Sequence, residues 1–162
     1  MAGKIRVCTE LDFDRMYQII NEAARKYEGV IPADRYHQPY MPREELRQEM
    51  KRMTFFGWEE PGDLAGVMGL EPVKDVSLIR HAYIAAKYQR QGIGSTLLDH
   101  AVDRYTGKRL LVGTWADASW ALDFYKKHGF RLCLDKEKLL KTYWDIPDRQ
   151  IETSVVLELV RK

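Results

Sequence analysis

The sequence predicts one α/β domain of mixed, α+β character, in which a central mixed sheet carries helices on both faces. Segments with the two-residue period of strands alternate along the chain with segments that have the helical period. The run Leu110–Trp115 is almost continuously apolar, which is typical of a central strand covered on both sides. The length of 162 residues suits one ordinary domain, so residues 1–162 are assigned to a single domain.

The first part of the chain predicts a strand, two helices and a long loop. Ile5–Cys8 is a short apolar strand candidate, and the spacing of Thr9 and Asp12 is that of a helix cap. The helix that follows places its apolar residues on one face, namely Met16, Ile19, Ile20, Ala23, Ala24 and Tyr27. Residues 28–41 show no period and form a loop, after which Pro42 opens a second helix.

The middle of the chain predicts three strands. Thr54–Glu59 and Leu64–Glu71 flank a Pro-Gly turn that joins them as a hairpin, and Ser77–Ala85 is the third strand. Simple alternation along the third strand would place four side chains on one face: Leu78, Arg80, Ala82 and Ile84.

The last part of the chain predicts alternating helices and strands. A helix from about Gly94 to Thr106 precedes the central strand, and a second helix, Ser119–His128, leads into the strand Phe130–Leu134. Lys136–Trp144 has helical spacing and is predicted to be a short inserted helix. Ile151–Val160 alternates between apolar and polar residues, so we expect it to close the sheet as an antiparallel strand.

Composition argues against several classes of function. The chain has 26 basic and 24 acidic side chains, so its net charge of +2 gives no broad basic field for nucleic acid or membranes. Cys8 and Cys133 are too few for a disulfide framework, and His100 and His128 lack partner ligands at metal spacing, so no metal is expected. No apolar stretch resembles a membrane span or a signal peptide, which favours a cytoplasmic protein.

The segment with the clearest chemistry is the turn Gln89–Ser95, between a predicted strand and a predicted helix. A P-loop requires a Lys-Ser/Thr pair after its second glycine, and the dinucleotide fingerprint requires a third glycine where Leu97 stands. Neither pattern fits. The pattern that remains, Gln-x-x-Gly-x-Gly, presents backbone N–H groups at a helix N-terminus, where they can bind an anion. Taken alone, the same pattern also fits a tight turn without a ligand.

A longer pattern surrounds this turn. Its first motif consists of Ile84, Tyr88, Gln89, Gly92, Gly94, Leu97 and Leu98. Its second motif follows further along the chain and consists of Ala121, Leu122, Phe124, Tyr125, Gly129 and Phe130. Together the motifs closely resemble those of the GNAT superfamily of N-acetyltransferases, and the resemblance covers essentially the whole chain. It implies a GNAT-like fold and an acetyl-CoA-dependent acyltransferase, in which a primary amine attacks the thioester directly within a ternary complex.

The same resemblance implies where coenzyme A binds. The end of the third strand, at Ile84, Ala85 and Ala86, would bond the pantetheine arm like an added strand. The turn would wrap the pyrophosphate with Gln89, Arg90, Gln91, Gly92, Ile93, Gly94 and Ser95. Two positions depart from the family pattern: Ala86 replaces the usual proline, and Ala118 replaces the common asparagine, so pantetheine contacts near Ala118 should differ.

Acetyl transfer to an amine needs a proton donor for the thiolate and a base for the amine. The resemblance assigns the donor role to Tyr125. The base stays open, because Leu78 and Arg80 occupy the positions where relatives place a carboxylate or a histidine. The candidates, each of which also fits a structural role, are Glu71, His81 and Tyr83.

The acceptor side is predicted from the two segments that depart from plain helix and strand patterns. Aromatic residues of the long loop and the insert are expected to roof the pocket, namely Tyr36, His37, Tyr40, Tyr143 and Trp144. Arg80 either points into this pocket or pairs with a helix. The acceptor is a small-molecule or peptide amine, and a homodimer stays open. A non-catalytic acyl-CoA sensor on the same fold is the alternative function.

Overall fold

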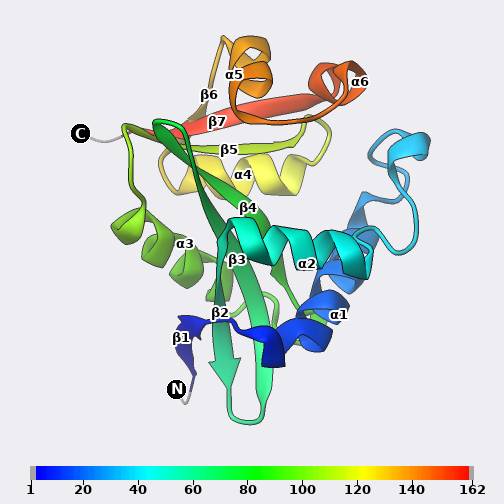
Figure 1. Ribbon diagram of the computed structural model, residues 1–162, viewed down its shortest axis with the longest axis vertical. Helices are drawn as coiled ribbons and strands as arrows, with labels where there is room; N and C mark the ends of the chain where they lie inside the picture. Colours follow the sequence, from blue (N-terminus) through cyan, green and yellow to red (C-terminus); the bar gives the residue numbers. More distant parts are fainter. Residues whose placement is uncertain (1–2, 161–162) are drawn as a thin grey trace.

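The computed structural model describes residues 3–160 and shows a seven-stranded mixed sheet (Figure 1). The strand order across the sheet is β1-β2-β3-β4-β5-β7-β6. Strands β4 and β5 run parallel, and the other neighbouring pairs are antiparallel. The strands are β1 (Lys4–Val7), β2 (Thr54–Glu60), β3 (Asp63–Val73), β4 (Val76–Ile84), β5 (Arg109–Trp115), β6 (Phe130–Leu132) and β7 (Ser154–Leu159). The predicted fold class is therefore confirmed.

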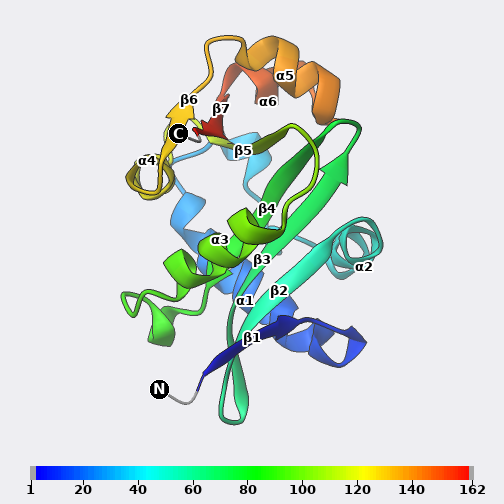
Figure 2. The ribbon, with the colours of Figure 1, turned by 90° about the vertical axis from the view of Figure 1, so that its left-hand side faces the viewer.

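Helices cover both faces of this sheet (Figure 2). One face carries α3 (Ile93–Arg104) and α4 (Ser119–Lys127) over a shared apolar cluster. The other face carries α1 (Phe13–Ala23) and α2 (Arg43–Arg52) at one end and α5 (Lys136–Tyr143) and α6 (Asp148–Glu152) at the other. Four short 3₁₀ turns complete the part of the chain that the structure describes: Glu10–Asp12, Ala24–Tyr27, Ala33–Arg35 and Ala86–Tyr88.

The predicted cap at Thr9 is present. The Thr9 hydroxyl accepts a hydrogen bond from the Leu11 N–H at 3.2 Å, and the Asp12 carboxylate accepts one from the Thr9 N–H at 2.8 Å. Arg6 of β1 donates to both Asp12 oxygens at 2.8 Å, so the same carboxylate also fixes the strand before the helix. Residues 10–12 form a 3₁₀ turn, and α1 begins directly after it.

Strands β4 and β5 separate halfway along their length. They pair only from Val76 to Ile79 on β4 and from Arg109 to Val112 on β5. Beyond Ile79, the end of β4 keeps its pairing with β3 but has no strand on its other side within the described residues. This separation opens the middle of the sheet, which is the place where the helices of both faces come together.

A β-bulge at His81 corrects the predicted alternation of β4. The pairing with β3 slips between Val67 and Gly69, and His81 has a φ of 52°, in the left-handed region. The extra residue breaks the two-residue period. Leu78 and Arg80 therefore lie on the face of α2 and α5, whereas Ala82 and Ile84 pack with α3 on the opposite face. The prediction that all four share one face was wrong.

The predicted strand from Ile151 to Val160 is shorter than expected. Residues 148–152 form α6, which starts directly after Pro147, and β7 begins only at Ser154. Ile151 is 7% exposed and packs in the cluster under α5. A buried residue of a short helix and a buried residue of a strand are both apolar. Alternation in the sequence therefore could not distinguish α6 from an extension of β7. Within residues 3–160, no helix is long and apolar enough to cross a membrane.

Candidate active site

A cavity of about 460 Å³ lies where β4 and β5 separate. It connects the two faces of the sheet, since residues of α4 border it on one face and residues of the α1–α2 region border it on the other. Its walls include the end of β4 from Arg80 to Ile84, the end of β5 from Val112 to Trp115, and side chains of the insert. The volume is in the range of about 300–1,000 Å³ that is usual for ligand sites.

The glycine turn lies at one end of this cavity, where Gln89 and Gly94 border it. Arg90 has a φ of 65° and Gly92 a φ of 80°, and the backbone N–H groups of residues 92–95 have no acceptor in the part of the chain that the structure describes. These groups lie at the N-terminus of α3, where the helix dipole also favours a negative charge. No atom lies within 4 Å of the place where a Cβ at Gly92 would stand. The turn therefore leaves space for a phosphate close to the backbone.

The other residues predicted to hold a cofactor lie around this turn. Gln89, Gly94 and Ile84 line the cavity, and the Gln89 amide donates to the Ile84 carbonyl at 3.1 Å. The N–H groups of Ala85 and Ala86 already donate to the Ala65 carbonyl and to the Glu22 carboxylate. Of the predicted strand-end residues, Ile84 thus borders the cavity, and the other two have their N–H groups occupied.

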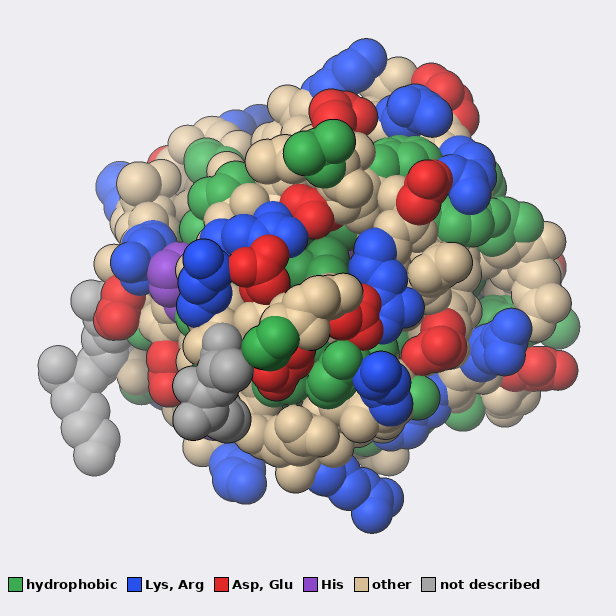
Figure 3. Space-filling view, turned by 90° about the horizontal axis from the view of Figure 1, so that it is seen from below, with side chains coloured by type: hydrophobic (Ala, Val, Ile, Leu, Met, Phe, Trp, Pro, Cys, Tyr) green, Lys and Arg blue, Asp and Glu red, His purple; other side chains and the backbone are tan. Residues whose placement is uncertain are grey.

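Charged side chains of both signs are mixed on the surface of the protein (Figure 3). Basic and acidic side chains alternate on the face shown in Figure 3, without a broad region of one sign. The face in Figure 3 therefore offers no broad positive region that would attract an anionic ligand over a long range. Within residues 3–160, no cluster of three or more potential ligands could hold a metal ion.

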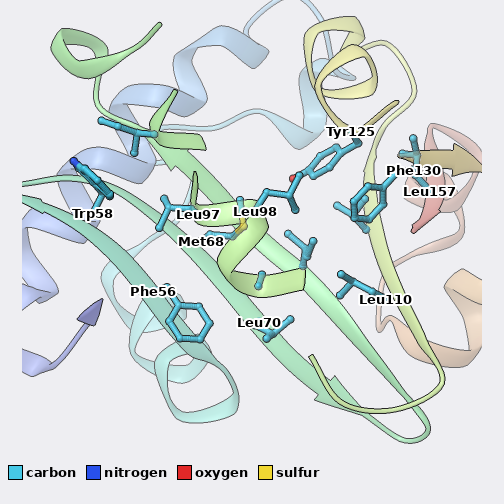
Figure 4. Close-up of a cluster of buried hydrophobic side chains, with 14 of the residues drawn as sticks. Phe56, Trp58, Met68, Leu70, Leu97, Leu98, Leu110, Tyr125, Phe130 and Leu157 are labelled. Carbon is cyan, nitrogen blue, oxygen red and sulfur yellow. The ribbon is translucent and has the colours of Figure 1, made fainter. Parts of the chain in front are cut away.

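Tyr125 of α4 is one of the residues that line the cavity. Its ring packs against Phe130 with 5.5 Å between the ring centroids, and its hydroxyl points toward the middle of the sheet (Figure 4). The side chain is 5% exposed, yet its hydroxyl makes no hydrogen bond to another described residue. Burial raises the pKa of Tyr125, so the hydroxyl keeps its proton across the neutral pH range. Tyr125 therefore carries a protonated hydroxyl without a hydrogen-bond partner among the described residues, on a side chain that lines the cavity.

The three candidate bases differ in their positions. Glu71 does not line the cavity, and its carboxylate accepts a hydrogen bond from Arg80 at 2.9 Å. Tyr83 lines the cavity and its ring meets that of Tyr27 edge-on, with 6.5 Å between the ring centroids, but burial raises its pKa well above the usual value. His81 also lines the cavity, and burial lowers its pKa below the usual 6.5, against the opposing effect of Glu49. His81 is therefore neutral at neutral pH, as a base must be.

Glu49 of α2 was missed by the sequence analysis. It is 3% exposed and its Oε1 lies 2.8 Å from the Nε2 of His81. A signal for it exists in the sequence: Glu49 lies three residues after Leu46 and four before Met53, so it interrupts the apolar stripe of its helix. Carboxylates are almost never fully buried without a partner, which makes such a position informative.

The side of the cavity that was predicted to take the acceptor contains some of the residues predicted for it. Tyr40, Trp144 and Arg80 line the cavity, whereas Tyr36, His37 and Tyr143 do not. Tyr40 accepts a hydrogen bond from the Trp115 indole at 3.2 Å, and the Trp144 ring lies against Gly113, 3.0 Å from the place of a Cβ there.

The long loop and α6, which follows the insert, meet beside this side of the cavity. Arg35 donates to Gln150 at 2.9 Å, and Asp34 pairs with Arg149 at 3.2 Å. Both partners belong to α6, and Gln150 itself lines the cavity. Two segments far apart in the sequence therefore form one roof.

Known proteins share this architecture. A family model described as the acetyltransferase (GNAT) family matches residues 13–130. PaiA N-acetyltransferase from Thermoplasma acidophilum, in complex with coenzyme A, is similar with a TM-score of 0.75 and 18% identity, over 99% of this chain and 100% of that chain. The ribosomal-protein-S18-alanine N-acetyltransferase of Escherichia coli is similar with a TM-score of 0.68 and 18% identity, over 97% and 92%. N-acetylglutamate synthase from Neisseria gonorrhoeae, with coenzyme A and N-acetyl-glutamate, has a TM-score of 0.67 and 19% identity, over 97% of this chain and 34% of that chain. At these identities the structural similarities establish the fold.

Proposed function

Because the chain belongs to the acetyltransferase (GNAT) family, it is an acyltransferase that uses acetyl-CoA, and we propose that it transfers the acetyl group directly to a primary amine bound beside it. The observation that carries the proposal is that the cavity reaches from the glycine turn at Gln89 and Gly94 to both Tyr125 and His81. One cavity therefore joins an anion site, a proton donor and a neutral base.

The residues present fit coenzyme A. The free N–H groups of residues 92–95 and the open space at Gly92 suit its pyrophosphate, and Ile84 borders the path that its pantetheine arm would follow between β4 and β5. Acetyl-CoA supplies the acetyl group as an activated thioester.

Two side chains handle the protons in the proposed reaction. As the new C–N bond forms, His81 takes a proton from the amine on the ring nitrogen that does not face Glu49. As the C–S bond breaks, the Tyr125 hydroxyl gives its proton to the sulfur. Since burial raises the pKa of Tyr125, its oxygen regains a proton readily, from His81 or from water, which returns both groups to their starting states. A base that borders the cavity also favours catalysis over a non-catalytic sensor.

The roof supports a small amine as the acceptor rather than a peptide. The contacts of Arg35 and Asp34 with α6 join the two segments that border the acceptor side, where a polypeptide would need an open groove. The cavity of about 460 Å³ must also hold part of the pantetheine arm, which leaves room for a compact molecule. Aromatic rings of Tyr40 and Trp144 line this space, and the guanidinium of Arg80 is already paired with carboxylates of the chain itself. Release of free thiol from acetyl-CoA that depends on an added amine tests the function.

Removing the Trp144 ring is expected to weaken acceptor binding selectively. Trp144→Ala should raise the KM for the amine about tenfold or more, because burying a large aromatic side chain against a ligand is worth about 1.5–3 kcal/mol. The affinity for coenzyme A should stay within about twofold, since the ring lies on the acceptor side. Tyr36→Ala is the matched control, because Tyr36 belongs to the same roof but does not line the cavity. Equal KM values in both variants would place the acceptor elsewhere.

A further inference from the structure

The buried carboxylate of Glu49 is the polar group that the reaction described above leaves unexplained. It projects from the apolar stripe of α2, between Leu46 and Met53, and is 3% exposed. Burying a carboxylate is costly unless partners satisfy it. The partners of the buried Glu49 carboxylate therefore indicate its role.

Glu49 has partners on both of its oxygens. Oε1 accepts from the His81 Nε2 at 2.8 Å and from the Arg80 Nη2 at 3.3 Å, and Oε2 accepts from Arg52. These bonds lower the pKa of Glu49 to about 2 against the effect of burial, so the group is ionised at any working pH. An ionised carboxylate can only accept, and the shared hydrogen must come from the imidazole.

The arginines and carboxylates around His81 pair with one another, so they neutralise each other while the imidazole is uncharged. Arg80 pairs with Glu71 as well as with Glu49, and Arg52 pairs with Glu49 from the same helix. Glu45, about one helical turn before Glu49 on α2, has a pKa raised by burial and by the Glu49 charge. The Phe55 ring stacks on the imidazole, with 6.1 Å between the ring centroids. His81 thus has Glu49, Arg80 and Glu71 as its charged neighbours, from α2, β4 and β3.

We infer that Glu49 is a positioning residue for His81: it holds the imidazole in the tautomer with hydrogen on Nε2 and leaves Nδ1 to take the proton of the acceptor amine. The inference rests on the proposed function, in which His81 is the base. A carboxylate behind an imidazole fixes the tautomer and stabilises the imidazolium that forms when the amine proton arrives. The strained φ of 52° at His81 fits this role, because the bulge turns the ring toward α2 instead of leaving it in the strand pattern.

The test uses Glu49→Gln in the full chain. The amide oxygen can still accept from Nε2, but the negative charge that raises the pKa of His81 is gone, so that pKa must fall. Since the base works only when neutral, the acidic limb of the kcat/KM profile should move to lower pH, by about one unit. Above that limb, kcat should fall about tenfold, because a less basic imidazole takes the amine proton less readily.

A second measurement does not depend on activity. Nitrogen NMR of histidine-labelled protein should show the Nε2–H tautomer for His81 in the unmodified chain and a lower titration midpoint in Glu49→Gln. Glu158→Gln is the matched control, because Glu158 is also a partly buried carboxylate paired with an arginine, Arg109, but lies away from the cavity. It should leave both the pH limb and the His81 signals unchanged.

Two results would overturn the inference. One is an Nδ1–H tautomer for His81 in the unmodified chain. The other is a Glu49→Gln variant that melts at lower temperature but keeps the pH limb and the His81 midpoint, which would make Glu49 a structural tie between α2 and β4. If the chain showed no acetyl transfer at all, the NMR result would still decide the tautomer, so failure of the proposed function is distinguishable from failure of this inference.

Discussion

Tyr125→Phe is expected to lower kcat by about 10² to 10⁴, the usual worth of general acid catalysis. The substitution removes only the hydroxyl of a residue that lines the cavity, and this hydroxyl has no hydrogen-bond partner among the described residues. The ring and its contact with Phe130 remain, so the affinity for coenzyme A should barely change. Steady-state kinetics and calorimetry on the same preparation give both quantities.

A structural role for the hydroxyl predicts a different pattern. If it mainly stabilised the fold, the variant would melt at lower temperature while kcat stayed near normal. Since the hydroxyl has no partner to lose among the described residues, we expect little change in melting temperature. A kcat within about twofold of the unmodified chain would remove Tyr125 from the mechanism.

Gly92→Val is expected to weaken coenzyme A binding about 100-fold or more. A side chain at this position would occupy the space beside the free N–H groups of residues 92–95, where the phosphate would approach. Loss of two charge-assisted hydrogen bonds, each worth about 1.5–3 kcal/mol, corresponds to at least that factor. Calorimetric titration with coenzyme A measures the change.

The chain offers a close control for this variant. Gly62, in the turn between β2 and β3, has a φ of 77° and, like Gly92 with its φ of 80°, no atom within 4 Å of a Cβ. Valine at either position carries the same backbone strain, so both variants should lose similar stability. Unchanged affinity for coenzyme A in a folded Gly92→Val protein, or an equal loss in Gly62→Val, would contradict the assignment of the phosphate site.

Much of the fold could be predicted because the spacing of apolar residues in a helix or a strand follows directly from which of its faces is buried. The apolar run Leu110–Trp115 is central in the sheet, and the cap at Thr9 begins the first helical segment. The secondary-structure prediction failed where a short helix and a strand would both bury the same apolar residues. Ile151 is buried from a five-residue helix rather than from a strand, and the short segment is too brief to show a helical period.

The candidate site was less accessible to sequence reasoning because it depends on one inserted residue. The bulge at His81 exchanges the faces of the following residues and turns the imidazole toward Glu49, although nothing in local composition marks a bulge there. The position of Glu49 beside β4 is likewise a long-range contact that no period in the sequence encodes. By contrast, the glycine turn is a local feature, and its geometry follows from the residues themselves.

The most direct test of the account is to look for the product. The full chain would be incubated with acetyl-CoA and a set of primary amines, including compact apolar amines and a short peptide, while free thiol and acetylated amine are quantified together. We expect equal amounts of free coenzyme A and acetylated amine with at least one compact amine, and a rate that is lower by about 10² or more in Tyr125→Phe. Tight binding of coenzyme A without any acetylated amine would contradict it and would identify the chain as a non-catalytic acyl-CoA sensor.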